Sequence, residues 1–108
     1  DFLDSIQREE YGPWADAQLD DLPVNFLGNA DTSTGNSGSP VLDGKGRIVG
    51  LNFDRVFENI AGDFGYHPAR SRNIMVDVRA ILWYLDRHAL ARNLLDEMGV
   101  PASTGKKR

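Results

Sequence analysis

Residues 35–55 read GNSGSPVLDGKGRIVGLNFDR, and this stretch decides the fold. Within it, residues 39–43 and residues 47–54 have the apolar and β-branched content of strands, and a Gly-Lys-Gly turn at residues 44–46 separates them. Two strands joined by a short glycine-rich turn form a β-hairpin. The stretch therefore predicts an antiparallel sheet that is entered through a polar, glycine-containing loop.

Two further strand-like segments lie on either side of the hairpin. Residues 22–29 and residues 73–78 are rich in β-branched, aliphatic or aromatic side chains, as strands are. Small polar residues at 30–38 predict a loop before the hairpin. After it, residues 55–72 contain two glycines, one proline and three arginines without a sustained period, which predicts a long loop.

The segment after the last strand changes to helical spacing. Apolar side chains recur every three to four positions over residues 79–98, and the stripe shifts near His88, which predicts two short helices. Gly99 and Pro101 predict the end of the second helix, and residues 2–10 have weaker helical spacing. The pattern predicts one unit over residues 1–108, mainly β with C-terminal helices: strands over about 22–78, helices over about 79–98 and a tail at 100–108.

The bulk composition is that of one small globular domain. Of the 108 residues, 41% are hydrophobic and 26% are charged. The net charge of −4 argues against a nucleic-acid surface, and no apolar stretch is long enough to cross a membrane. The absence of cysteine excludes disulfides and thiolate metal sites. We expect no cofactor, no metal, and neither a nucleic-acid nor a membrane partner. The acidic first residues lack a signal-peptide pattern, so we expect the chain to begin inside a longer protein.

The residues with the clearest chemical potential are in GNSGSP at 35–40. A serine hydroxyl attacks only when a base takes its proton, and the resulting oxyanion needs fixed donors. Glycines around Ser37 would expose its hydroxyl and let the N–H groups of Gly35 and Ser37 point at one oxyanion. Alone, such a string is more often a surface turn. The α/β-hydrolase elbow has a different pattern, Gly-x-Ser-x-Gly before a helix, whereas a hairpin follows here.

The string resembles the GDSGGP signature of chymotrypsin-like peptidases, with Asn36 in place of the aspartate and Ser39 in place of the second glycine. In trypsin-type relatives, that aspartate binds an ammonium released by zymogen cleavage. Neutral Asn36 could not form this ion pair, so activation by that route is not expected here.

Most of the chain resembles a particular family. Over residues 22–99, the runs LPVNFLGN, GNSGSPVLDGKGRIVGLNFDR, FENIAGD, IMVDVRAILWYLDR and ARNLLDEMG resemble the C-terminal part of the bacterial dipeptidyl-peptidases of the 7 and 11 type. The resemblance implies a chymotrypsin-like serine exopeptidase that removes dipeptides from free N-termini. It also implies that this chain forms part of the second β-barrel of a double β-barrel fold, and that the enzyme is exported to the periplasm or cell surface of a Gram-negative bacterium.

The resemblance also implies site residues. Ser37 would be the nucleophile, and the amides of Gly35 and Ser37 would form the oxyanion hole. Asp54 would help to hold the substrate's α-ammonium, and Arg55 matches the position that is arginine in the type selective for Asp and Glu. The implied partners are peptides with a free N-terminus and the remainder of the peptidase chain.

Other residues and other functions are less favoured. His67 and His88 follow the serine in the chain, whereas the histidine and aspartate of chymotrypsin-like enzymes precede it, so we expect the base upstream and the isolated chain to be inactive. Asp20 and Asp21 are expected to be a solvated pair. The alternatives are a piece of an HtrA-like or glutamyl endopeptidase, or a non-catalytic piece that self-associates through exposed apolar surface, which leaves a homo-oligomer open.

Overall fold

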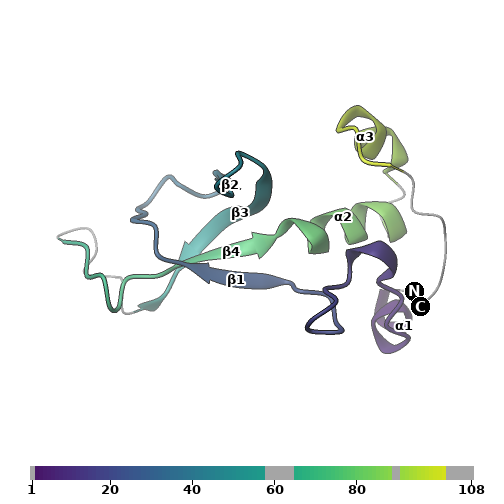
Figure 1. The fold of residues 1–108 in the computed structure, drawn as a ribbon, viewed down its shortest axis with the longest axis horizontal. Coiled ribbons are helices and arrows are strands. Elements are labelled where there is room, and N and C mark those ends of the chain that lie inside the picture. Colours follow the sequence, from purple (N-terminus) through teal and green to yellow (C-terminus); the bar gives the residue numbers. More distant parts are fainter. Residues whose placement is uncertain (1, 58–64, 89–90, 102–108) are drawn as a thin grey trace. The chain divides into compact units, whose positions relative to one another are not determined.

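The computed structural model describes residues 2–57, 65–88 and 91–101 (Figure 1). The chain divides into two compact units, one of residues 24–78 and one of residues 1–23 with 79–108. We call the first the sheet unit and the second the helical unit. Most of the predicted tail and the middle of the loop predicted at 55–72 lie outside the described residues.

The sheet unit contains four antiparallel strands. They are β1 (Asn25–Gly28), β2 (Pro40–Leu42), β3 (Ile48–Arg55) and β4 (Asn73–Asp77). Their order across the sheet is β1-β4-β3-β2, so β4 lies between the first strand and the hairpin (Figure 1). The predicted hairpin is confirmed as β2 and β3, and both flanking strands form, although β1 is shorter than the segment predicted at 22–29.

The turn of the hairpin is held by one carboxylate. Asp43 Oδ1 accepts hydrogen bonds from the backbone N–H groups of Lys45 and Arg47, at 2.8 and 3.0 Å. Gly46 has a φ of 78°, a left-handed conformation that favours glycine. The Gly-Lys-Gly sequence therefore forms the turn that its composition predicts.

Gly50 allows β3 and β4 to pack closely beside β1. A Cβ atom at Gly50 would lie 2.5 Å from the carbonyl oxygen of Val76 and 2.9 Å from the ring of Phe26. Neither distance is compatible with normal packing, and the first involves backbone that cannot rotate away. Gly50 is therefore required by the approach of the neighbouring strand rather than by its own backbone angles.

The helical unit contains α1 (Phe2–Gln7), the short 3-10 helix η1 (Gly12–Trp14), α2 (Val78–Arg87) except its first residue, and α3 (Arg92–Glu97). The two predicted C-terminal helices are thus confirmed, with the break after Arg87. Gly99 has a φ of 74°, and the N–H groups of Gly99 and Val100 donate to the carbonyls of Asp96 and Leu95. These two bonds form a Schellman motif, which explains why the last helix ends there.

Trp83 is the centre of the helical unit. Its side chain is 4% exposed, and its Nε1 donates a 2.9 Å hydrogen bond to the carbonyl of Glu10. The rings of Phe2, Tyr11 and His88 lie with centroids 5.8, 5.6 and 4.8 Å from the Trp83 ring. The first residues of the chain therefore pack with the last helices.

The sequence, which shows no linker, predicted a single unit. It did not reveal the division into a sheet unit and a helical unit.

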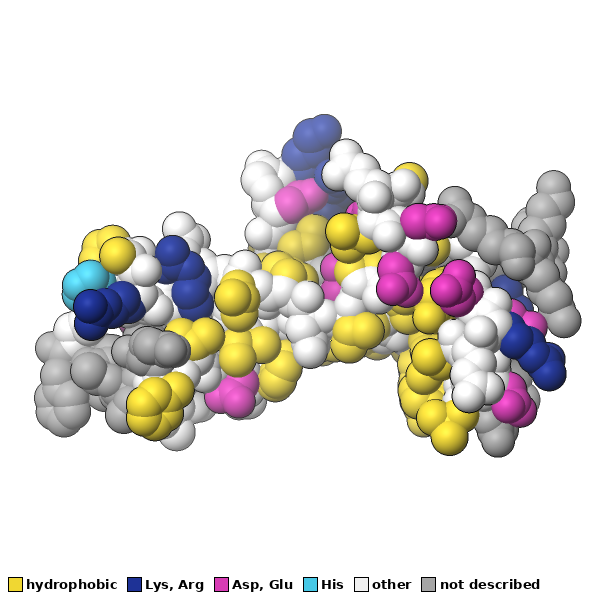
Figure 2. All heavy atoms as spheres, turned by 90° about the horizontal axis from the view of Figure 1, so that it is seen from below, with side chains coloured by type: hydrophobic (Ala, Val, Ile, Leu, Met, Phe, Trp, Pro, Cys, Tyr) yellow, Lys and Arg dark blue, Asp and Glu magenta, His cyan; other side chains and the backbone are white. Residues whose placement is uncertain are grey.

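The surface of both units includes large apolar side chains (Figure 2). In the sheet unit these include Leu27, Leu42 and Ile48, each more than half exposed. Among the described residues, no helix has the length and apolar character that a membrane crossing requires. That same part of the chain contains no cluster of three or more side chains suited to a metal ion. Self-association remains a prediction.

We predict that Gly50→Ala destabilises the chain, because the new methyl group would force β3 away from the Val76 carbonyl. Overpacking of this kind costs roughly 1–3 kcal/mol. The free energy of unfolding, measured by urea denaturation, checks this value. Gly44→Ala is the matched control, because nothing lies within 4 Å of a Cβ at Gly44. Equal stabilities of the two variants would contradict the packing argument.

A second prediction concerns the ion pair of Asp16 with Arg79, whose Oδ2 and Nη1 atoms lie 2.7 Å apart. The Arg79 side chain, followed by the backbone N–H groups of Leu19 and Gln18, lowers the pKa of Asp16 from 3.8 to about 2. Because folding lowers this pKa, ionised Asp16 stabilises the fold above about pH 3.8. This contribution is lost as the pH falls from there through about 2.

The pKa of Asp16 can be measured by carbon-detected NMR of its carboxyl group. Arg79→Gln should raise that pKa but leave it below 3.8, because both backbone donors remain. Lys45→Gln, a change in the sheet unit, is the control and should leave the Asp16 titration where it is. An Asp16 pKa that is the same with and without the Arg79 guanidinium would refute the assigned cause.

Candidate active site

Ser37 lies in an irregular segment, residues 29–39, between β1 and β2; we call it the Ser37 loop. Gly35 has a φ of 98° and Gly38 a φ of 86°, so two turns of this loop need residues without a Cβ. Ser37 itself is exposed, and its Oγ lies 3.5 Å from the carbonyl oxygen of Phe53, at the outer limit of a hydrogen bond. The hydroxyl is therefore accessible and only weakly held.

The five backbone amides of residues 35–39 fall into two groups. Three donate within the protein: Asn36 to the carbonyl of Ser33 at 3.2 Å, Gly38 to that of Asn52 at 2.7 Å, and Ser39 to that of Asn36 at 3.1 Å. The amides of Gly35 and Ser37 donate to no acceptor among the described residues. These two N–H groups are the ones that the sequence predicted for the oxyanion hole, and they remain available to a ligand.

Asn36 uses its side chain within the loop. Its Oδ1 accepts a 2.7 Å hydrogen bond from the backbone N–H of Ser33. The residue that replaces the aspartate of the chymotrypsin-like signature thus closes a local turn. That Asn36 does not bind a newly formed N-terminal ammonium stays a prediction.

Ser37, Asp54 and Arg55 line one cavity of about 210 Å³ together with residues of the Ser37 loop. Asp54 is exposed, and its Oδ1 accepts a 2.8 Å hydrogen bond from the backbone N–H of Arg55. The Arg55 guanidinium donates from Nη1 to the carbonyl of Thr32 at 3.3 Å. The structure therefore brings together Gly35, Ser37, Asp54 and Arg55, the four residues that the sequence singled out.

A β-bulge in β3 precedes the two charged residues. Asn52 pairs with Met75 and Asp54 with Ile74, so Phe53 is the extra residue on this strand. A bulge of this kind changes the direction of the side chains that follow it. In a regular strand, the side chains of Asn52 and Asp54 would lie on the same face of the sheet. Here Asn52 is buried and Asp54 is exposed, as the intervening bulge allows. The strand pattern of the sequence gives no signal for the bulge.

The other candidates lie elsewhere. His67 is exposed and absent from the lining of this cavity, and the ring of His88 packs against aromatic rings of the helical unit. Asp21 Oδ1 accepts the N–H of Leu22, and Asp20 lies in a turn closed by its own N–H to Asp16. Of these four residues only His67 belongs to the sheet unit, and it does not line the cavity that contains Ser37.

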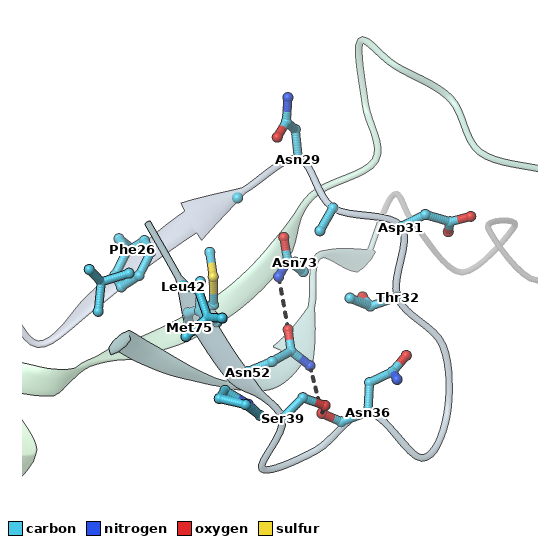
Figure 3. A pocket seen from close by; sticks show the side chains of 15 residues that line it. Phe26, Asn29, Asp31, Thr32, Asn36, Ser39, Leu42, Asn52, Asn73 and Met75 are labelled. Atoms are coloured by element: carbon cyan, nitrogen blue, oxygen red, sulfur yellow. Dashed lines mark hydrogen bonds between the residues drawn. The ribbon is translucent and has the colours of Figure 1, made fainter. Parts of the chain in front are cut away.

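A larger cavity of about 520 Å³ borders the same loop and shares Thr32 and Asn52 with the first one. Apolar side chains from the strands, such as Phe26 and Met75, form part of its wall (Figure 3). Asn52 and Asn73 also line it, and their side chains are hydrogen-bonded to each other (Figure 3). Sequence reasoning missed these two asparagines. Their signal was the placement of asparagine inside strands, where it is uncommon.

The sequence of this chain matches a known protein family over most of its length. The sequence profile of the peptidase S46 family matches residues 1–100. The chain belongs to the peptidase S46 family. Its curated S46-like relatives include the Asp/Glu-specific dipeptidyl-peptidases of Flavobacterium psychrophilum, 43% identical over 89% of this chain, and of Shewanella putrefaciens, 48% identical over 75% of it. The dipeptidyl-peptidase 7 of Capnocytophaga gingivalis is 38% identical over 92% of the chain.

A solved structure shares the fold of this S46 chain. The crystal structure of Porphyromonas endodontalis DPP11 in complex with the dipeptide Arg-Asp has a TM-score of 0.87 and 36% sequence identity, over 92% of this chain and 14% of that one. The chain spans 13%, 11% and 14% of the three curated relatives. The resemblance inferred from the sequence is therefore confirmed for the family. The fold, predicted as mainly β with C-terminal helices, is a mixed α/β arrangement with a four-stranded antiparallel sheet.

Proposed function

We propose that the full-length protein containing this chain is a serine-type dipeptidyl-peptidase and that Ser37 is its nucleophile. One observation carries the proposal: an exposed serine hydroxyl lies in a loop whose only amides without an acceptor, among residues 35–39 of the described chain, are those of Gly35 and Ser37. Two free N–H groups beside a nucleophile are what an oxyanion requires. The names of the relatives supply the class of substrate.

The proposed reaction is acyl transfer followed by hydrolysis. Ser37 Oγ attacks the carbonyl carbon of the second peptide bond while a general base takes the hydroxyl proton. The tetrahedral oxyanion accepts hydrogen bonds from Gly35 and Ser37, and the base then returns the proton to the departing amine. Water, activated by the same base, attacks the acyl-enzyme and releases the dipeptide. The base and the acid that orients it would come from the part of the full-length protein outside this chain.

Asp54 is proposed to bind the free α-ammonium of the substrate. The carboxylate is exposed and lies in the same cavity as Ser37, and only one of its oxygens accepts the Arg55 amide. A charged hydrogen bond to an ammonium is stronger than a neutral one. Binding the amino group at a fixed distance from Ser37 would limit cleavage to dipeptide release and would disfavour blocked peptides.

Arg55 is proposed to select Asp or Glu before the scissile bond. Its side chain is half-buried and lines the cavity, where its planar guanidinium can donate paired hydrogen bonds to a carboxylate. Two of the curated relatives are named for this specificity.

We further propose that the sheet unit is part of a second chymotrypsin-like β-barrel, and that the enzyme acts in the periplasm or at the cell surface.

The first test uses a fluorophosphonate probe, which labels activated serines. The full-length protein should be labelled stoichiometrically, and Ser37→Ala should abolish the labelling, whereas Ser5→Ala in the helical unit should not. The isolated 108-residue chain should stay unlabelled at neutral pH, because it would lack the base that activates Ser37. Stoichiometric labelling of the isolated chain would show that the base lies within it.

The second test is Arg55→Gly in the full-length enzyme. Loss of a charged hydrogen bond of roughly 1.5–3 kcal/mol should lower kcat/KM about 10- to 100-fold for substrates with Asp or Glu before the scissile bond. Activity towards Leu or Met at that position should hold or rise, because no guanidinium would then have to lose its hydration against an apolar side chain.

Arg47→Gly, which removes an exposed arginine just before β3, is the control and should change neither activity. Equal losses on acidic and apolar substrates after Arg55→Gly would instead assign Arg55 a structural role. N-acetylated peptides should be poor substrates throughout; efficient cleavage of them would favour an endopeptidase.

A further inference from the structure

The carbonyl oxygen of Asn36 accepts an unusual number of hydrogen bonds. The backbone N–H of Ser39 donates to it at 3.1 Å, the Oγ of Ser39 donates to it as well, and Asn52 Nδ2 donates at 3.2 Å. A carbonyl oxygen has only two lone pairs, so three donors leave it little freedom to rotate. The peptide bond between Asn36 and Ser37 is therefore held in one orientation.

This orientation also sets the direction of the Ser37 N–H. The structure contains no cis peptide in its described part, and in a planar trans peptide the C=O and the following N–H point in opposite directions. Since the Asn36 carbonyl points to Asn52 and Ser39, the Ser37 N–H must point away from them. Rotation of this one peptide would turn the amide away from the oxyanion that it is proposed to bind.

Asn52 holds the Ser37 loop at three atoms. Besides its side-chain bond to Asn36, its carbonyl accepts the N–H of Gly38 at 2.7 Å, and its own N–H donates to the carbonyl of Ser39 at 2.9 Å. The residue is 6% exposed, so these bonds are shielded from water. A substitution of Asn52 that preserves the strand keeps both backbone hydrogen bonds. It removes only side-chain hydrogen bonds, so their effect can be measured by itself.

A second buried asparagine fixes the rotation of the Asn52 amide. Asn36 offers a carbonyl, which can only accept, so Asn52 must present its NH₂ group to it and its Oδ1 to the other side. There, Asn73 Nδ2 donates to Asn52 Oδ1 at 2.9 Å (Figure 3). Asn73 is 2% exposed and comes from the central strand β4. Each residue therefore donates to the next: Asn73 to Asn52, and Asn52 to Asn36. We call this chain of hydrogen bonds, which runs from the middle of the sheet to the Ser37 loop, the relay.

We propose that Asn52 is a positioning residue: its side-chain amide, oriented by Asn73, fixes the 36–37 peptide so that the Ser37 N–H faces the oxyanion. This inference rests on the proposed function, because it assigns a role in the same reaction. Asn52 acts through the Asn36 carbonyl and contributes to the transition state more than to substrate binding. Its loss should therefore lower kcat and leave KM nearly unchanged.

The test is Asn52→Leu in the full-length enzyme, a change of similar shape that removes the donor. Loss of one oxyanion donor costs about 10²- to 10³-fold in kcat, and a donor that is misaligned for part of the time should cost on the order of 10- to 100-fold. Rates are divided by the number of active sites, counted from the amplitude of a fluorophosphonate titration, so that unfolded protein does not contribute. Asn25→Leu, at an exposed asparagine of β1, is the matched control.

Two ligands distinguish positioning from a structural role. A peptide boronate whose tetrahedral adduct mimics the transition state should bind Asn52→Leu more weakly by about the same factor as kcat falls. A product dipeptide, which forms no oxyanion adduct, should bind equally well. Unchanged kcat per active site with a lower melting temperature would overturn the proposal, as would an equal loss in affinity for the boronate and for the dipeptide.

A second variant guards against a misfolded first one. Asn52→Asp restores a donor to Asn36 only when the new carboxyl group is protonated, so the ratio of its kcat to that of the wild type should rise as the pH falls. A ratio that is independent of pH, together with normal kcat, would contradict the relay. Ser37→Ala distinguishes failure of the proposed function from failure of this inference. An active Ser37→Ala enzyme would overturn the proposed function. An inactive Ser37→Ala enzyme together with an unimpaired Asn52→Leu enzyme would overturn only the role of Asn52.

Discussion

The hydrogen bonds between Asn52 and residues 36–39 are the constraint on which the candidate site depends. The Ser37 loop has no regular secondary structure, and two of its residues need left-handed backbone angles, so it has little intrinsic preference for one conformation. Strand β3 supplies that preference through one residue, which bonds the loop with its N–H, its carbonyl and its amide. A rigid strand thus holds a loop that could not hold itself.

The same strand supplies further residues that line the cavity. Asp54 and Arg55 follow Asn52 after a single extra residue, Phe53, so nucleophile support and the proposed substrate contacts share one strand. Because all of these groups are attached to β3, a shift of β3 relative to β4 would move the Ser37 loop and both charged side chains together. Gly50, which lets the two strands approach, lies two residues before Asn52 and is part of that linkage.

Local sequence patterns predicted the hairpin, the flanking strands and the two last helices, because each depends on periodicity or turn residues within about twenty positions. Four residues of the cavity were also named in advance: Gly35 and Ser37 from their local pattern, and Asp54 and Arg55 only through family resemblance. The rest depends on distant contacts. The Phe53 bulge, the Asn52–Asn73 bond and the packing of Trp83 on the first residues join positions 20 to 81 residues apart, and no local pattern encodes such pairings.

The separation between Glu10 and Trp83 has a consequence for how the chain acquires its structure during synthesis. The hairpin and the backbone bonds of the Ser37 loop join residues at most 16 positions apart, so they can form while the chain is still emerging from the ribosome. The hydrogen bond from Trp83 to the carbonyl of Glu10 can form only after 73 more residues have been made. Until then, Phe2 and Tyr11 lack the aromatic partner that covers them. Within this chain, Phe2 and Tyr11 are thus made before the ring that they pack against, and they stay open to non-native contacts and to chaperones until α2 has been made.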